Sequence, residues 1–307
     1  MKAILLFFVV VFSFKTWAQE TIQSSYVLVL GVAQDGGYPH MGCQKNCCTL
    51  AWKNQKLKKN VVSLALVDPK SKKWWLFEAT PDIKLQLQDF RKRTNEAYPY
   101  LPEGIFITHA HIGHYTGLME FGREVMSANR LKVYTLPKLK SFLEQNGPWS
   151  QLVKLNNINL VTLSADQSID IANNKITAFT VPHRDEFSET AGFKIETPTK
   201  KYLFIPDIDK WSKWNKNIID EVKKVDIAMI DATFYSNTEL GNRPIAEVPH
   251  PLVTETEKLF SMEAPNVKNK IFFIHFNHTN PLLWDPTYQK QVLKSGFHFA
   301  KQGDIYY

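Results

Sequence analysis

Four apolar segments of this chain run directly into residues that can bind a metal ion. The segments and the residues that follow them are 104–107 with His109 and His111, 178–182 with His183, 202–206 with Asp207, and 271–274 with His275. A short apolar run bounded in this way is typical of a buried strand. One histidine after one strand is more often structural than a ligand, but the repetition indicates a metal site built at the ends of strands.

The first of these segments leads into three closely spaced histidines, in the order Thr-His-Ala-His-Ile-Gly-His. Residues i and i+2 of an extended segment point to the same side, so His109 and His111 are positioned to bind one metal together. His114 falls where a following helix is expected to begin, close enough to face the same cavity. Zinc prefers imidazole nitrogen and carboxylate oxygen, and a catalytic zinc keeps one position open for water.

Strand and helix patterns continue through both halves of the chain. Predicted strands are 25–32, 61–67, 74–77, 104–108, 131–135, 158–163, 176–181, 192–196, 202–205, 225–230 and 271–274, and predicted helices are 81–90, 114–126, 137–145 and 255–262. No Gly/Ser-rich or Pro-rich linker divides the chain, and no short-period repeat is present. We therefore predict an α/β fold over residues 19–307, with two facing mixed sheets and helices outside.

The chain is basic, with a formal charge of +7 and a pI of about 9.1. Part of this charge lies in the lysine-rich stretches 53–59 and 70–73, which are typical of solvated loops. No DNA-binding or RNA-binding motif accompanies the charge, so we expect no nucleic-acid partner. The expected partner is a small-molecule substrate, for which a mild attraction to anions is compatible with the charge.

The N-terminal residues 1–18 have the layout of a secretory signal peptide. Lys2 supplies a positive start, residues 4–14 are apolar except for Ser13, and the segment ends at the small residue Ala18. The apolar run is short for a membrane span. We expect cleavage near Gln19, a secreted or periplasmic protein, and no stable membrane insertion afterwards. An uncleaved N-terminal anchor is the alternative.

The order of these histidines and aspartates resembles the signature of the metallo-β-lactamase superfamily, which is His-x-His-x-Asp-His after a strand, then a later His, an Asp and a final His. The resemblance implies the αβ/βα fold of that superfamily. It also implies the following roles: His109, His111 and His183 hold the first metal, Asp207 bridges two metals, and His114 and a late histidine serve the second. For the late ligand we favour His275, and His278 is the alternative or a proton donor.

One departure from this signature concerns the second metal. The signature aspartate is Gly113 here. The second site is thereby reduced to His114, Asp207 and His275, so we expect one tightly bound metal in the pocket. Replacing Gly113 with Asp is expected to raise the occupancy of the second site. A fully vestigial site is the alternative.

Several further stretches look like coenzyme PQQ synthesis protein B and its relatives. They are 31–39, 79–83, 205–209, 277–281 and 230–234, the last of which is also similar to a segment of RNase Z. In that family the histidine-rich motif is usually altered, whereas three of its histidines survive here. A signal peptide also fits poorly with a biosynthetic step in the cytoplasm, so we interpret the chain as a relative whose substrate has changed.

All three cysteines lie together in one loop, as Cys43, Cys47 and Cys48. In an exported protein such a group suggests a disulfide, but the odd count leaves one thiol unpaired. With His40 nearby, the three cysteines form a candidate Cys₃His structural zinc site. The resemblance supports the zinc site, because the relatives carry cysteine-bound zinc in the corresponding loop. A disulfide with one free thiol remains the alternative.

Three classes of function follow from these features. The first is a metal-dependent hydrolase of an ester, lactone or phosphodiester, in which Asp207 holds the nucleophile and Asp82, Asp231 or His278 moves protons. The second is an iron-dependent oxygenase or hydroxylase like coenzyme PQQ synthesis protein B, since histidine and carboxylate ligands with open positions also suit iron. The third is a non-catalytic protein that binds a metal or a small ligand. Asp82, Asp231 and His278 each have an ordinary structural role as the alternative.

Overall fold

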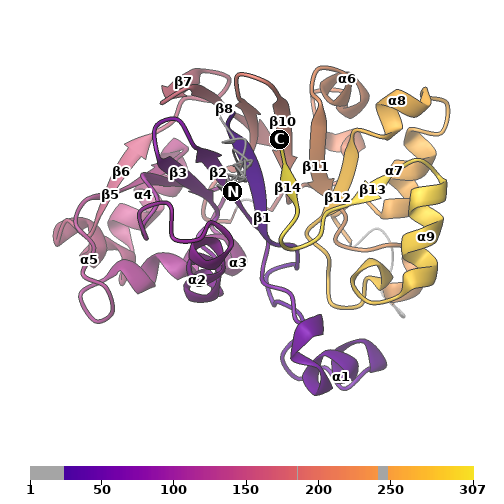
Figure 1. The fold of residues 1–307 in the computed structure, drawn as a ribbon, viewed down its shortest axis with the longest axis horizontal. Coiled ribbons are helices and arrows are strands. Elements are labelled where there is room, and N and C mark those ends of the chain that lie inside the picture. The colour runs from indigo at the N-terminus through magenta and orange to yellow at the C-terminus, as the bar shows by residue number, and fades with distance from the viewer. Residues whose placement is uncertain (1–23, 185, 241–247) are drawn as a thin grey trace, which may run out of the picture.

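Two seven-stranded sheets pack face to face, and helices cover the outer side of each (Figure 1). The computed structural model describes residues 24–184, 186–240 and 248–307, so the predicted signal peptide lies outside the described residues. This arrangement of two facing sheets between outer helices is the predicted αβ/βα fold. Within the described part of the chain, no helix is both long and apolar enough to cross a membrane.

The first sheet has the strand order β14-β1-β2-β3-β4-β5-β6, and the second has the order β13-β12-β11-β10-β9-β8-β7. The strands of the first sheet are β1 Tyr26–Gly31, β2 Ser63–Asp68, β3 Lys73–Phe77, β4 Gly104–Phe106, β5 Leu131–Thr135, β6 Ile158–Thr162 and β14 Ile305–Tyr306. Those of the second are β7 Ser168–Ile171, β8 Asn174–Val181, β9 Thr190–Glu196, β10 Lys201–Ile205, β11 Ile227–Asp231, β12 Ile271–Ile274 and β13 His298–Phe299. The predicted bounds of β5 and β12 agree with the structure.

The helices divide into two outer groups, apart from α1, which lies beyond the lower end of β1 in Figure 1. The α-helices are α1 Asn46–Lys53, α2 Ile83–Arg93, α3 Ile112–Tyr115, α4 Pro137–Gln145, α5 Trp149–Lys154, α6 Ile218–Lys223, α7 Val253–Leu259, α8 Pro265–Lys268 and α9 Pro286–Lys294. Short 3₁₀ helices are η1 Gln55–Leu57, η2 Thr116–Phe121, η3 Trp211–Lys213, η4 Asn237–Leu240 and η6 Pro281–Leu283. Helices α2 to α5 cover the first sheet, and α6 to α9 cover the second.

The first sheet is buried on both faces, which explains why β1 is a continuous apolar run. Val27 and Val29 face the second sheet, whereas Tyr26, Leu28 and Leu30 face the helices. Aromatic side chains fill the space between the sheets. The ring of Phe77 on β3 meets the ring of Phe193 on β9 edge to face, with 5.4 Å between the centroids. Such pairs fix the spacing of the two layers.

One edge of the sandwich collects the chain segments that carry the histidines. Strands β10, β11 and β12 are parallel to one another, and β8 runs in the same direction because both it and β10 are antiparallel to β9. Their carboxyl ends therefore lie at the same edge of the second sheet. The loop after β4 joins that edge through a hydrogen bond from Ala191 N–H to Thr108 O (3.0 Å).

The prediction of one helix over residues 114–126 is wrong. The chain forms the short helix α3 and then η2, which ends at Phe121. Gly117 lies at the change from α3 to η2, where its N–H donates to Ala79 O (2.8 Å) and a Cβ would lie 2.9 Å from Ala79 C. This close approach to the loop after β3 diverts the chain from a regular α-helix.

Candidate metal centre

Two groups of potential metal ligands lie side by side at the carboxyl edge of the strands. The first ligand set is His109, His111, His183 and Asp207, and the second ligand set is Asp35, His114 and His275. Within each set, one ligand atom from every residue lies within 4.8 Å of the others. The structure thus brings together every residue that the sequence predicts for the histidine pocket, and adds Asp35.

The first ligand set has the spacing of atoms that share one metal ion. Asp207 Oδ2 lies 3.2 Å from His183 Nε2 and 3.4 Å from His109 Nε2. His111 Nδ1 lies 3.2 Å from His183 Nε2. Two atoms bound to one tetrahedral zinc at about 2.0–2.1 Å lie about 3.3 Å apart, so these distances fit one shared metal. The side chain of His111 is the most exposed of the four, at 12%, and marks the side open to solvent.

The second ligand set meets the first at one carboxylate oxygen. Asp35 Oδ1 lies 3.1 Å from His114 Nε2 and 3.8 Å from His275 Nε2. Asp207 Oδ2 lies 3.8 Å from His114 Nε2 and 3.9 Å from His275 Nε2. Because the same Asp207 oxygen faces His109 and His183, it occupies the position of an atom shared between the two sets.

Most of these histidines are oriented through their second ring nitrogen. Thr108 Oγ1 lies 2.8 Å from His109 Nδ1, and Thr233 Oγ1 lies 2.9 Å from His275 Nδ1. Carboxylates take the same position behind the other two: Glu78 Oε1 is 3.2 Å from His114 Nδ1, and Asp209 Oδ1 is 3.3 Å from His183 Nδ1. Such partners fix the orientation of the ring and raise its basicity as a ligand. The sequence analysis did not identify Glu78 or Asp209.

Two residues of the centre adopt left-handed backbone conformations, Glu78 with φ 74° and His275 with φ 65°. Residues other than glycine rarely do so. Such conformations persist where the surrounding structure determines them, and they concentrate at functional sites. Both residues follow directly after a strand, so each turn directs a side chain into the centre.

Burial and neighbouring charges together determine the protonation of the groups in the centre. Burial lowers the pKa of His109 well below its usual value, so this imidazole is neutral, the form that binds metal. Burial acts in the same direction on His114, but the carboxylates of Glu78 and Asp35 outweigh it and raise its pKa well above the usual value. Burial alone would raise the pKa of Asp207, yet the histidines around it hold this pKa well below its usual value.

Several buried polar atoms of the centre lack a hydrogen bond within the part of the chain that the structure describes. They are Asp35 Oδ1, His109 Nε2, His114 Nε2 and His275 Nε2. Leaving such groups unpaired in the interior costs about 1–3 kcal/mol each. Their convergence on one pocket therefore fits a cation, and the mixture of imidazole nitrogen and carboxylate oxygen fits zinc.

His250 is a functional residue that the sequence analysis missed. Its Nδ1 lies 3.1 Å from Asp207 Oδ1 and 2.9 Å from Asp231 Oδ2, and its side chain is buried. Asp231 also accepts hydrogen bonds from Thr233 N–H (2.8 Å) and Ile208 N–H (3.1 Å). Asp231 and His250 therefore hold Asp207 in place. No strand is predicted from the sequence just before His250, so the pattern of a strand followed by a ligand did not identify it.

Two residues predicted to move protons lie elsewhere. Asp82 Oδ2 accepts a hydrogen bond from Val61 N–H (2.9 Å), a contact that joins the start of α2 to the loop before β2. His278 lies with the cysteines, with its Nδ1 3.4 Å from Cys48 Sγ. The structure therefore gives Asp82 the ordinary structural role and places His278 outside both ligand sets.

The cysteine loop and His278 form a third group of potential ligands, Cys43, Cys47, Cys48 and His278. The three cysteines are free, so the disulfide alternative is wrong for this structure. His40 was predicted in this group, but its ring stacks on that of His278, with 4.5 Å between the centroids, and its Nδ1 lies 2.8 Å from Met41 O. Burial raises the pKa of Cys48 to about 12, which argues against a nucleophilic thiol and fits a thiol that ionises only with a metal.

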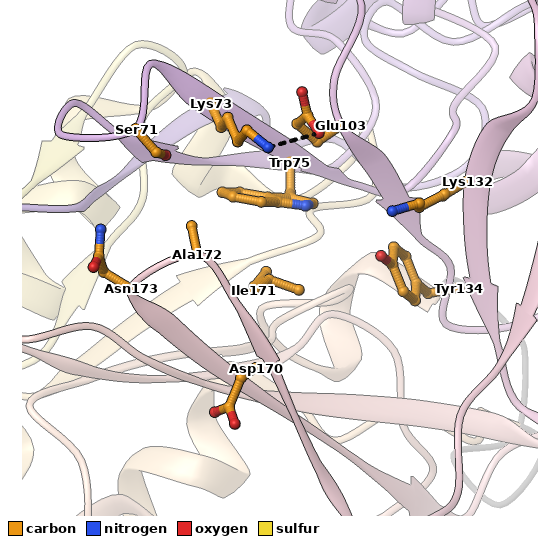
Figure 2. Close-up of a pocket in the computed structure, with 10 residues that line it drawn as sticks. All are labelled: Ser71, Lys73, Trp75, Glu103, Lys132, Tyr134, Asp170, Ile171, Ala172 and Asn173. Atoms are coloured by element: carbon orange, nitrogen blue, oxygen red, sulfur yellow. Dashed lines mark ion pairs between the residues drawn. The ribbon is translucent and has the colours of Figure 1, made fainter.

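A cavity of about 610 Å³ lies between the cysteine loop and the metal centre. Its walls include His40, Lys45 and His278 on one side and Thr233 and His250 on the other. Figure 2 shows a separate cavity of about 510 Å³, lined from β3, β5 and the β7–β8 turn, with an ion pair between Lys73 and Glu103 (3.4 Å). None of its lining residues among those described belongs to a ligand set, so the chemistry is not placed there.

Comparison with known proteins bears on both the fold and the centre. The sequence model described as a beta-lactamase superfamily domain matches residues 73–276, more than half of the chain. Coenzyme PQQ synthesis protein B of Methylorubrum extorquens is 21% identical over 302 residues, which cover 91% of this chain and 98% of the relative. The protein of the same name from Acinetobacter baylyi is 25% identical over 300 residues, covering 87% and 94%.

Solved structures share the fold at low sequence identity. Zinc-bound PqqB from Methylobacterium extorquens has a TM-score of 0.74 and 20% identity, over 91% of this chain and 99% of that chain. A diphosphatase from the PhnP family has a TM-score of 0.63 and 17% identity, over 92% and 96%. These findings confirm the predicted resemblance in fold and family.

Proposed function

The chain belongs to the beta-lactamase superfamily, and from this premise we propose that it is a metal-dependent hydrolase of a small anionic molecule. The proposal depends on one observation above all: the first ligand set is complete, and its four ligand atoms converge at distances that fit one metal. The shared fold alone would not support an activity, because one fold hosts many functions.

Zinc is the metal that we propose for the first ligand set. Three imidazoles and one carboxylate suit it, and the open side next to His111 leaves room for water and substrate. A zinc ion there would lower the pKa of a bound water to about 7 and would polarise a scissile carbonyl or phosphoryl group. The three histidines would hold the ion and Asp207 would orient the nucleophile, while Asp231 and His250 fix the Asp207 carboxylate.

The cavity next to the centre supports an anionic substrate. Lys45 and Arg184 both line it and provide positive charge. Among the described lining residues the one carboxylate is Glu239, which already accepts hydrogen bonds from Ser236 N–H and Thr279 Oγ1, and burial raises its pKa. A volume of about 610 Å³ suits a small molecule, within the range of about 300–1,000 Å³ that is usual for ligand sites.

The test is a metal analysis of the purified protein followed by turnover of esters, lactones and phosphodiesters. Zinc-dependent hydrolysis is expected, with loss of activity in His111→Ala and retention in Asp82→Asn, which changes a carboxylate outside the ligand sets. A protein that holds zinc but binds substrate analogues without a pH-dependent turnover would instead be a non-catalytic binding protein.

One observation favours a second candidate function, an iron-dependent oxygenase. The second ligand set contains two histidines and one carboxylate, a combination typical of non-haem iron(II) oxygenases. Several curated relatives are PQQ synthesis proteins, which makes oxidation chemistry relevant. Oxygen consumption by the iron-loaded protein but not by the zinc-loaded protein would favour this function over hydrolysis.

We also propose that the chain is exported, on the basis of the N-terminal segment alone. N-terminal sequencing of material from the periplasm or the medium should give a start near Gln19. Recovery of chains with intact Met1 in the cytosol would contradict export and leave the metal centre unaffected.

A further inference from the structure

The space next to Gly113 is filled by another part of the chain. A Cβ atom at position 113 would lie 2.6 Å from Asp35 Cα and 2.8 Å from Asp35 Cγ, closer than real Cβ atoms approach. The φ angle of Gly113 is not in the left-handed region. Glycine is therefore required here because there is no space for a Cβ atom, and not because of its backbone conformation. The atoms that occupy this space belong to Asp35.

Asp35 is held in this place by contacts of its own loop. Gln34 N–H donates to Phe276 O (2.8 Å), and Phe276 N–H donates to Val32 O (2.8 Å). These two bonds join the loop after β1 to the residue that follows His275. The Asp35 carboxylate is therefore fixed beside both His275 and His114, the two histidines of the second ligand set.

We propose that Asp35 supplies the carboxylate that position 113 lacks, so that the second ligand set binds a second metal ion beside the first. Asp35 Oδ1 lies 3.1 Å from His114 Nε2, a spacing that fits two ligands of one metal. Asp35 Oδ1, His114 Nε2 and His275 Nε2 are all buried and lack a hydrogen bond within the described residues. The inference rests on the metal centre proposed above and adds a second ion to it.

The carboxylate of the second ligand set thus comes from a different part of the sequence than the superfamily signature predicts. In the superfamily signature it stands next to the histidine that follows it, whereas here it comes from the loop after β1. On this proposal, two expectations from the sequence change. The pocket would hold two metal ions and not one, and Gly113→Asp would not raise occupancy, because the new side chain overlaps Asp35.

For the test, the full chain is loaded with zinc and passed through gel filtration. Elemental analysis then compares the zinc content of the variants with that of the unmodified protein. Asp35→Asn should contain about one zinc per chain fewer than the unmodified protein, because an amide is a poor zinc ligand. The matched control is Asp170→Asn, the same change at an exposed aspartate of the cavity in Figure 2, and it should lose none. The cysteine loop contributes equally to every variant.

A second variant removes no ligand. Gly113→Ala should displace Asp35 and also lose about one zinc, whereas Gly147→Ala, where a Cβ meets nothing within 4 Å, should keep all of them. Zinc content in Asp35→Asn equal to that of the unmodified protein would overturn the role of Asp35 even if the first ligand set is filled. If His111→Ala also leaves the zinc content unchanged, the proposed metal centre itself fails.

Discussion

The two ligand sets are built in different ways. The first set takes every ligand from a segment that follows a strand, β4, β8 or β10. The second set combines His275 after β12 with His114 at α3 and Asp35 from the loop after β1. A ligand fixed by the end of a strand can be recognised from the local pattern of residues. A ligand supplied by a loop is recognisable only once the fold has brought it to its partners.

The largest effect is expected at the residue that the two sets share. Asp207→Ala should remove metal from both sets, because Asp207 Oδ2 faces histidines of each. Mutation of groups that only orient a ligand already costs about 10–100-fold in metal affinity or activity. Loss of the shared ligand should therefore exceed about 100-fold in kcat/KM, measured with the best substrate of the panel. An Asp207→Ala protein that keeps both metals would show that the sets are independent.

The next largest effect should distinguish the two ligand sets by their metal affinity. Glu78→Gln weakens the support of His114 Nδ1, so affinity at the second set should fall by about 10–100-fold while the first set is unchanged. The matched change behind the first set is Asp209→Asn, because Asp209 Oδ1 lies 3.3 Å from His183 Nδ1. Zinc titration followed by calorimetry measures the zinc affinity of both ligand sets in each variant. Equal losses at the two sets in both variants would contradict the division into two sets.

The cysteine loop should respond separately from both sets. Cys43→Ser should remove about one zinc and lower the Tm by several degrees, since a closed structural zinc contributes directly to folding. The zinc content of the histidine pocket should stay the same. Thiol titration of the denatured, metal-free, unreduced chain should find three free thiols. A single free thiol would mean that a disulfide forms between two of the three cysteines.

The smallest effect concerns how the thermal stability of the metal-free protein depends on pH. Burial opposes the charge of His183, but the Asp207 carboxylate outweighs it and raises the pKa of His183 to about 9. This pKa lies above the unfolded value of about 6.5, so the contribution to stability is complete below pH 6.5 and is lost as the pH rises through 9. The Tm of the stripped protein should fall over this range, and His183→Gln should flatten that fall. In the zinc-loaded protein the fall should be absent, because zinc needs neutral histidine.

Much of the fold could be predicted because its strands are buried on both faces. The sequence alone indicates the bounds of β12, which is an apolar run, and of β5, in which only Lys132 is exposed. The strands β13 and β14 have two residues each, too short for any periodicity. Their positions are determined by pairing with the neighbouring strands, and no local sequence pattern predicts them.

The same contrast, between residues recognisable from a local pattern and residues placed by the fold, applies to the metal centre. The ligands of the first set follow apolar strands, so their spacing along the sequence was informative. Glu78 directly follows β3, so the pattern of a strand followed by a polar residue could have identified it. Asp35 and His250 reach the centre through contacts between distant segments, and each looks like an ordinary loop residue in the sequence. His278 was misplaced for the same reason, because its partner Cys48 comes from the other end of the chain.

The most direct test of two metals in one pocket is a crystal structure of the zinc-loaded protein with data collected at the zinc absorption edge. We predict two anomalous peaks in the histidine pocket, one on each side of Asp207. Asp35 should lie about 2.0–2.2 Å from the peak that also contacts His114 and His275. A single peak at His109, His111 and His183, with no metal bound to Asp35, would contradict the account.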